Sequence, residues 1–290
     1  MDFVKMHSSG NDFVIVREDE SRRVWGKLSK VICDRRFGVG ADGVLIVLPS
    51  NKADFRVRVI NSDGSEAEIC GNGLICLGKY ACEAGIVAPD ASEVKVETKA
   101  GIKNINLVRQ GGKVQQVRVV FGHPRFRPEQ VPALVQGEPG MNGAAKPVLD
   151  YTLFAGNRKL LLNMVSMGNP HAVCFTGKPV DDFPLNRLGP IVEHHPIFPQ
   201  RVNFEVARIV DSGRIEARVW ERGAGETLAC GSGACAIAVT ARLHGFVGSS
   251  VEVALPGGKL KVEWDGSGEV ALTGSPELVF KGAWLNDGGL

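Results

Sequence analysis

The chain of 290 residues has little net charge, no long apolar run and no cysteine pair in C-x-x-C spacing. Its 34 Lys and Arg against 32 Asp and Glu leave a formal charge of +2, too small to predict nucleic acid or an anionic membrane surface as a partner. The sequence contains no stretch of about 18 consecutive apolar residues, so it predicts no membrane span. The first residues, MDFVKMHSSGNDF, lack the apolar core of a secretory signal, so we expect a cytoplasmic protein.

The chain has seven cysteines, an odd number in a sequence too long to need a disulfide scaffold. We therefore expect free thiols. Because the Cys and His spacings match no zinc finger or ribbon, the sequence predicts no metal site. Five thiols lie within apolar runs and are expected in the core, where cysteine packs as a small hydrophobe: Cys33, Cys76, Cys82, Cys174 and Cys235.

The main feature that is present is an internal repeat. EAEICGNGLICLGKYACEAGIV begins at residue 66 and GETLACGSGACAIAVTARLHGFV at residue 225. Aligning Cys70 with Cys230 gives an offset of 160, which also aligns Glu66 with Glu226, Gly71 with Gly231, Gly73 with Gly233 and Gly85 with Gly245. Upstream, Gly10-Asn11 and Gly168-Asn169 each precede an apolar run at an offset of 158. The sequence thus predicts two copies of one α/β unit.

Each copy is expected to turn from a strand into a buried helix. Helices over 71–84 and 231–244 are apolar nearly all round, and Gly85 and Gly245 follow them as natural C′ residues. Strands are predicted at 13–16, 55–60, 94–98, 172–175, 214–220, 251–255 and 259–264. Residues 270–278 could return to the first half as a closing strand. The Pro- and Gly-rich stretch 124–147 predicts a crossover loop.

Cys70 and Cys230 each come directly before one of these helices. The unpaired N–H groups and partial positive charge of a helix N-terminus stabilise an anion. We therefore expect both thiols to have a pKa lowered toward neutrality, with the following glycines admitting a ligand close to the backbone. Two such thiols facing each other could remove a proton from one face of a carbon and return one to the other face, as stereoinversion requires. Structural N-caps and a regulated disulfide in a redox protein are the alternatives.

Six segments resemble the diaminopimelate epimerase family along nearly the whole chain. They are KMHSSGNDFVIV (5–16), RRFGVGADGVLIV (35–47), NSDGSEAEICGNG (61–73), MGNPHAVCF (167–175), RVNFEVARI (201–209) and ERGAGETLACGSGACA (221–236).

The resemblance implies an α/β (α+β) fold of two pseudosymmetric domains, each a curved, mostly antiparallel sheet or barrel around a central helix. It implies one domain at 1–123 with 276–290, another at 124–275, and an active site in the cleft between them. It also implies a PLP-independent isomerase that interconverts LL- and meso-2,6-diaminopimelate in lysine and peptidoglycan precursor biosynthesis. No cofactor or metal is implied, and homodimers are common in the family.

The resemblance also assigns roles to individual residues. Cys70 would accept the proton and Cys230 donate it in the LL-to-meso direction, assisted by His171 and Glu221. The segments that would hold the α-carboxylate at the helix ends are Gly71-Asn72 and Gly231-Ser232. The remaining residues would grip the substrate: Asn11, Asn61, Asn169, Asn203, Glu221 and Arg222. These side chains suit a zwitterion, because arginine binds carboxylates bidentately and asparagine both donates and accepts without a net charge.

One position departs from the pattern, and other functions stay open. Gly43 stands where some relatives carry Gln, so a contact from that position would be absent here. A proline racemase or hydroxyproline epimerase of the same fold is the alternative reading; Arg222 and the asparagines favour a longer, doubly charged substrate. Phenazine-biosynthesis isomerases share the architecture but lack the cysteine pair.

Overall fold

The computed structural model describes residues 1–18, 23–135 and 146–285. It divides the chain into two compact units, Met1–Val120 with Thr273–Leu290 (unit 1) and Phe121–Leu272 (unit 2). Among the described residues, no helix has the length and apolar character needed to cross a membrane.

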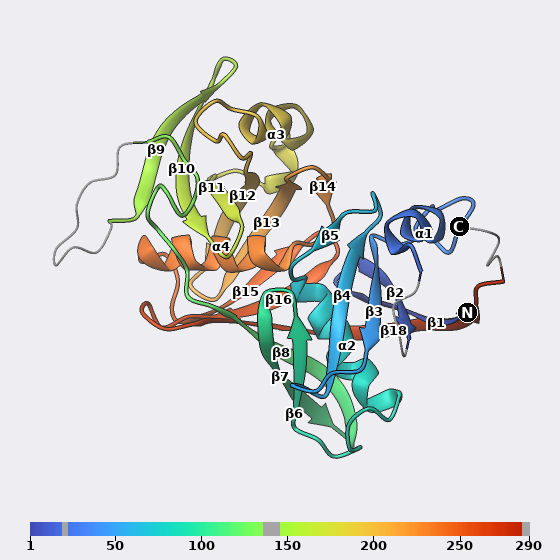
Figure 1. Cartoon of the computed structure of the whole chain (residues 1–290). Helices are drawn as coiled ribbons and strands as arrows, with labels where there is room; N and C mark the ends of the chain where they lie inside the picture. Colours follow the sequence, from blue (N-terminus) through green and yellow to red (C-terminus); the bar gives the residue numbers. More distant parts are fainter. Residues whose placement is uncertain (19–22, 136–145, 286–290) are drawn as a thin grey trace. The chain divides into compact units, whose positions relative to one another are not determined.

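Unit 1 consists of strands arranged around the helix α2 (Gly71–Glu83), which packs against β1, β7 and β18 (Figure 1). Its strands are β1 (Asp2–Ser8), β2 (Asn11–Arg17), β3 (Gly43–Leu48), β4 (Phe55–Asn61), β5 (Glu66–Ala67), β6 (Glu93–Thr98), β7 (Gly101–Gln110), β8 (Lys113–Gly122) and β18 (Pro276–Ala283). They pair in the order β18-β1-β2-β3-β4-β6-β7-β8, with β5 also on β4. Among these pairings of the described residues, β2–β3 and β4–β6 are parallel and the others are antiparallel. A second helix, α1 (Trp25–Ile32), packs on β4.

Unit 2 repeats this plan around the helix α4 (Gly231–Leu243) (Figure 1). Its elements are β9 (Val148–Ala155), β10 (Arg158–Ser166), β11 (Pro170–Phe175), the 3-10 turn η2 (Val180–Asp182), α3 (Leu185–Glu193), β12 (Asn203–Asp211), β13 (Arg214–Glu221), β14 (Gly225–Thr227), β15 (Ser250–Leu255) and β16 (Gly258–Glu263), followed by β17 (Val270–Gly274). The pairing order is β9-β10-β11-β12-β13-β15-β16, with β14 on β13. Of the pairings just named, β11–β12 and β13–β15 are parallel and the others are antiparallel.

The strand registers confirm the predicted repeat. Phe13 lies opposite Gly43 in the parallel pair β2–β3, and His171 lies opposite Asn203 in β11–β12. Both offsets read from the sequence, 158 and 160, are therefore kept in three dimensions. Asn11 and Asn169 open equivalent strands, and Cys70 and Cys230 precede equivalent helices.

The predicted central helices and strands are confirmed, with small changes at their ends. Gly85 and Gly245 take positive φ values of 64° and 74° two residues after the helices end, as C′ glycines do. The segment 270–278 forms two strands, β17 and β18, and β18 pairs with β1 as the closing strand. Within the stretch 124–147, Arg125 bridges to Ser166, and residues 136–145 lie outside the described residues.

The strand β3 is buried at every residue because helices cover both of its faces. Val44 and Ile46 join the cluster around Trp25 and Ile32 of α1, whereas Leu45 faces α2 and lies against Gly73. This explains the unbroken apolar run GVLIVL, since a strand covered on both sides has no polar face.

We predict that Gly189→Ala destabilises unit 2. A Cβ at this position of α3 would lie 2.4 Å from the Trp220 ring, which is tethered because its Nε1 donates to Glu193 at 2.8 Å. Overpacking of this kind costs about 1–3 kcal/mol in the free energy of unfolding. Urea denaturation should show a lower midpoint for this variant than for Gly177→Ala, whose Cβ meets nothing within 4 Å. Equal midpoints would contradict the prediction.

Candidate active site

Each of the two predicted thiols is the N-cap of its central helix. Cys70 and Cys230 both have extended backbone angles, and each Sγ accepts a hydrogen bond from the N–H three residues later, Gly73 or Gly233, at 3.4 Å. Either glycine, given a Cβ, would bring it to 3.2 Å from a side chain of the neighbouring strand. The Cys-Gly-x-Gly sequence therefore lets a helix start with a thiol close against the sheet.

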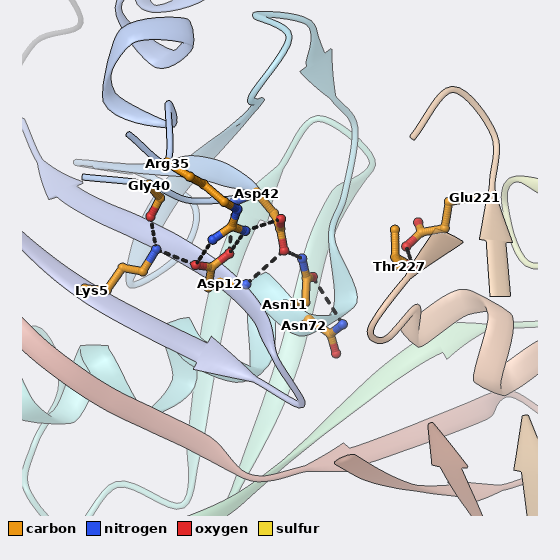
Figure 2. A network of polar contacts seen from close by, with 9 residues as sticks. All are labelled: Lys5, Asn11, Asp12, Arg35, Gly40, Asp42, Asn72, Glu221 and Thr227. Carbon is orange, nitrogen blue, oxygen red and sulfur yellow. Dashed lines mark hydrogen bonds and ion pairs between the residues drawn. The ribbon is translucent and has the colours of Figure 1, made fainter. Parts of the chain in front are cut away.

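The Cys70 half-site contains Cys70, Asn11, Asn72 and Asp42. Asn72 is buried, and its Nδ2 donates to Asn11 Oδ1 at 3.2 Å. The Cys70 thiol lies 4.0 Å from the same oxygen. Asn11 Nδ2 donates in the opposite direction, to Asp42 Oδ2 at 2.7 Å (Figure 2). Three residues of the predicted set thus come together: Cys70, Asn11 and Asn72.

A charged network not foreseen from the sequence supports this half-site (Figure 2). Arg35 donates to both oxygens of Asp12, at 2.8 and 3.1 Å, and to Asp42 at 2.8 Å, while Lys5 donates to Asp12 at 2.6 Å. Burial would raise the pKa of Asp12, but the hydrogen bonds from Arg35 and Lys5 outweigh it and lower that pKa to about 2. Asp12 therefore stays ionised throughout the neutral range.

Asn61, also predicted to bind substrate, lies at the end of β4. Its Nδ2 donates to Ser65 Oγ at 2.9 Å, and its backbone N–H donates to Ser65 O, so it closes the turn before β5. Gly43 lies opposite Asn61 in β3–β4, and an added Cβ there would be 2.9 Å from Ile60 O. The close strand backbone explains a glycine at 43.

The Cys230 half-site contains Cys230, Ser232, Asn169 and His171, all from the predicted set. Ser232 Oγ lies 3.5 Å from Cys230 Sγ and accepts from Asn169 Nδ2 at 3.2 Å. The other end of that amide, Asn169 Oδ1, faces His171 Nε2 at 3.0 Å. These four side chains form one continuous chain of polar contacts.

Glu205 extends this chain and was missed in the sequence. Its Oε1 lies 2.7 Å from His171 Nδ1, and both side chains are fully buried. Burial raises the pKa of Glu205, partly opposed by His171. A glutamate at the centre of the buried strand run Asn203–Ala207 was the available signal, because carboxylates are almost never fully buried without a partner.

Three further residues predicted to grip the substrate make contacts within unit 2. Asn203 Nδ2 donates to Pro170 O at 2.8 Å, and its Oδ1 accepts from the Arg222 N–H at 2.9 Å. The Arg222 guanidinium donates to Gln200 O at 3.0 Å. Glu221 Oε1 accepts from Thr227 Oγ1 at 2.6 Å (Figure 2). Asn203 thus fixes the backbone position from which Arg222 extends.

The expectation of a lowered pKa is wrong for Cys230. Burial, followed by the Glu221 and Glu205 carboxylates, raises the pKa of this thiol well above its ordinary value. The hydrogen bonds from Ser232 and the Gly233 N–H oppose this effect without overcoming it. A helix end contributes about 2 kcal/mol at most, less than the desolvation of a buried thiolate beside two carboxylates. Cys230 is therefore a protonated thiol at neutral pH.

Four of the five remaining cysteines are buried as expected: Cys33, Cys76, Cys174 and Cys235. Burial raises the pKa of each, to about 12 for Cys33. Cys82 differs, because it is only half-buried and accepts from Arg109 Nη2 at 3.2 Å. No cluster of three or more His, Cys, Asp or Glu side chains placed to hold a metal occurs in the described part of the chain.

Solved structures with the same fold include epimerases and racemases. A probable proline racemase from Agrobacterium radiobacter K84 matches with a TM-score of 0.71 and 17% identity, covering 99% of this chain and 93% of that one. A hydroxyproline epimerase from Agrobacterium vitis matches with a TM-score of 0.68 and 17% identity, covering 97% and 91%. The predicted fold class is thereby confirmed: the chain has the two-unit α/β architecture of this group.

Sequence comparison identifies the family to which the chain belongs within this structural group. The family model for diaminopimelate epimerase matches residues 3–127 and 163–279. Diaminopimelate epimerases from Desulfovibrio desulfuricans and Carboxydothermus hydrogenoformans are 44% and 43% identical, over 97% and 98% of this chain and 97% and 100% of theirs. The chain belongs to the diaminopimelate epimerase family, and it is an isomerase.

We predict that Glu221→Gln makes Cys230 more reactive. The Glu221 carboxylate raises the pKa of the Cys230 thiol. Removal of this carboxylate lowers that pKa and so increases the fraction of thiolate at any fixed pH below the pKa. Alkylation by iodoacetamide at pH 8 should be about three- to tenfold faster, since one pKa unit changes the thiolate fraction tenfold. Peptide mass spectrometry measures the rate at Cys230 itself. Glu216→Gln, which removes the carboxylate of an ion pair with Arg208, is the control. An unchanged or slower rate in Glu221→Gln would contradict the assignment.

Proposed function

We propose that this protein interconverts LL- and meso-2,6-diaminopimelate by a two-base mechanism, with Cys70 and Cys230 as the proton-transferring groups. The observation that carries the proposal is the pair of thiols, each an N-cap at an equivalent position of a duplicated fold, in a chain of the diaminopimelate epimerase family. No cofactor is required by this mechanism, because the thiols themselves exchange the α-proton.

In the LL-to-meso direction, Cys70 as thiolate removes the α-proton and Cys230 as thiol delivers a proton to the opposite face. The roles exchange in the reverse direction. The raised pKa of Cys230 suits it to hold the proton that it donates. The backbone N–H groups at Gly71-Asn72 and Gly231-Ser232, at the two helix N-termini, provide donors for the α-carboxylate as charge develops on it.

The other predicted residues have supporting roles in this proposal. His171 and Glu221 act on the proton balance of the thiols, Glu221 through its charge beside Cys230. The distal amino-acid end is bound by the Arg222 guanidinium and by the amides of Asn11, Asn61, Asn169 and Asn203. Since the distal and reacting ends of diaminopimelate carry the same groups, several fixed polar contacts are needed to select one end.

Family membership also supports a proposal for the wider setting. We propose that the enzyme serves lysine and peptidoglycan precursor biosynthesis in the cytoplasm, acts as a homodimer, and binds substrate in a cleft between a domain at 1–123 with 276–290 and one at 124–275. Proline racemase or hydroxyproline epimerase activity is the second candidate, supported by the fold of the solved neighbours. Arg222 favours diaminopimelate, because proline has no second carboxylate for a guanidinium to bind.

We predict that Cys70→Ser and Cys230→Ser each lower the rate of diaminopimelate epimerisation by about 10²–10⁴, the contribution of general acid–base catalysis. A serine hydroxyl is similar in shape to a thiol but cannot exchange the proton near neutral pH. Both isomers of diaminopimelate and both enantiomers of proline should be assayed. Cys82→Ser, which changes a thiol outside both half-sites, should retain wild-type activity. A near wild-type rate in either variant would refute the assigned roles, and turnover of proline alone would refute the substrate.

A further inference from the structure

The two equivalent asparagines, Asn11 and Asn169, hold their amides in opposite orientations. In unit 1 the NH₂ group of Asn11 points to Asp42, so its carbonyl oxygen faces Cys70 and Asn72. In unit 2 the carbonyl oxygen of Asn169 points to His171, so its NH₂ group faces Ser232 beside Cys230. The same residue at the same place in the repeat thus offers an acceptor to one thiol and a donor to the other.

The orientation of Asn11 is fixed by a carboxylate. Asp42 Oδ2 accepts from Asn11 Nδ2 at 2.7 Å and from the Asp12 N–H at 3.2 Å, while its Oδ1 accepts from Arg35 at 2.8 Å (Figure 2). Because a carboxylate beside a guanidinium only accepts hydrogen bonds, it can face only the NH₂ side of an amide. The carbonyl oxygen of Asn11 is therefore turned toward Cys70.

The orientation of Asn169 is fixed by an imidazole hydrogen. His171 Nε2 faces an amide oxygen at 3.0 Å, so it must carry a hydrogen, and Nδ1 shares another with Glu205 at 2.7 Å. The pair is then either imidazolium with carboxylate or imidazole with carboxylic acid. In both forms the His171–Glu205 pair has zero net charge. This neutrality matters because the pair is fully buried, and an uncompensated charge is costly to bury. Without Glu205, a neutral imidazole could carry its hydrogen on either ring nitrogen, and the Asn169 amide could take either orientation.

The repeat explains why neither unit can adopt the orientation of the other. The positions equivalent to His171 and Glu205 are Phe13 and Leu45, both buried in unit 1. In the reverse comparison, the positions equivalent to Asp12 and Asp42 are filled by Pro170 and Val202, both buried in unit 2. Each unit therefore has polar partners for its own asparagine orientation and apolar residues where the other unit's partners lie.

We propose that Asp42, and Glu205 acting through His171, are positioning residues that set the two asparagines in opposite orientations and so bring the proton affinities of the two thiols closer together. Cys230 is buried and lies near two carboxylates, whereas Cys70 is half-buried. Asn169 donates to Ser232 Oγ, which leaves the Ser232 O–H free to donate to Cys230 Sγ and stabilise its thiolate. The oxygen of Asn11 instead accepts from the Cys70 thiol and stabilises its protonated form.

The proposed effect of the two asparagine orientations on the thiols rests on the two-base reaction proposed above. A reaction that runs in both directions moves one proton from Cys230 to the substrate and another from the substrate to Cys70, so the two thiols exchange protonation states. The transfer is fastest when neither state is strongly preferred. Donors at the more buried thiol and an acceptor at the less buried one offset the difference that burial creates.

The orientation can be tested without any substrate. In protein with ¹⁵N-labelled histidine, long-range ¹H–¹⁵N correlation reports which ring nitrogen of each histidine carries a hydrogen. The His171 signals are assigned by their loss in His171→Phe. We expect Nε2 of His171 to carry a hydrogen in the unmodified protein. A bare Nε2 in the unmodified protein would overturn the proposal.

The role of Glu205 can be tested with two substitutions. Glu205→Leu reproduces Leu45 of unit 1 and should lower kcat for diaminopimelate about 10–100-fold, the usual loss when the partner that orients a functional side chain is removed. Glu205→Gln should stay close to the wild-type rate, because its amide N–H can donate to Nδ1 and keep the hydrogen on Nε2. The Nε2–H signal should persist in Glu205→Gln and weaken in Glu205→Leu, where no partner at Nδ1 selects one tautomer.

Asp42 offers the matched pair in unit 1. Asp42→Asn can still turn an oxygen to Asn11 Nδ2 and should retain most of the activity, whereas Asp42→Leu should lose it to a similar degree as Glu205→Leu. Equal rates in the Leu and Gln variants at 205, whether high or low, would contradict the proposal. If the wild-type protein does not turn over diaminopimelate, the proposed function fails, and the histidine measurement still decides the orientation. The same measurement applies to the unmodified protein if a Leu variant does not fold.

Discussion

The attachment of each thiol to the first turn of a buried helix is the constraint on which the rest of the structure depends. Cys70 and Cys230 accept the N–H of Gly73 and Gly233, and these glycines let a strand approach the turn. The helices behind them are apolar nearly all round, so sheet residues on several sides fix their direction. A reactive atom held by a buried helix cannot drift, as a loop residue could. The interactions that stabilise the fold therefore also hold the reactive sulfur atoms in place.

Duplication of the backbone supplies the second thiol, and divergence of the side chains supplies the chemical difference. The strand order and both offsets are kept between the units, yet the polar partners of the two asparagines are different. A symmetric substrate site would bind either end of diaminopimelate and either protonation state equally. Residues such as Arg222 and Glu221, whose equivalents in unit 1 are Ser62 and Asn61, break this symmetry without disturbing the fold.

The repeat made most of the fold predictable. The central helices could be bounded within a residue because a Cys-Gly-x-Gly start and a Gly C′ stop mark them in both copies. The helices α1 and α3 were not predicted: Val24 and Pro184 provide no side-chain cap, and Pro190 lies inside α3. Their formation depends on packing, as Trp25 and Leu188 are buried against the sheet. Tertiary contacts, which local sequence does not reveal, decide such short elements.

The candidate site was predictable in its residues and less so in its electrostatics. The positions of Cys70, Cys230, Asn11 and Asn169 follow from the repeat. The raised pKa of Cys230 does not, because it depends on burial and on carboxylates brought close by β12 and β13. Glu205 was missed for the same reason. It lies in the segment NFEVA of β12, whereas its partner, His171, lies on β11. Only the parallel register of β11–β12 brings the two side chains together.

The most direct test of the account is the transfer of solvent deuterium to the substrate α-carbon. Either isomer of diaminopimelate is incubated with enzyme in D₂O, and substrate and product are analysed early in turnover. Two thiols on opposite faces predict deuterium in the product and almost none in the recovered substrate, in both directions, because the proton removed stays on one thiol while the other delivers deuterium. Equal labelling of product and recovered substrate would indicate one base serving both faces and would contradict the two-thiol account.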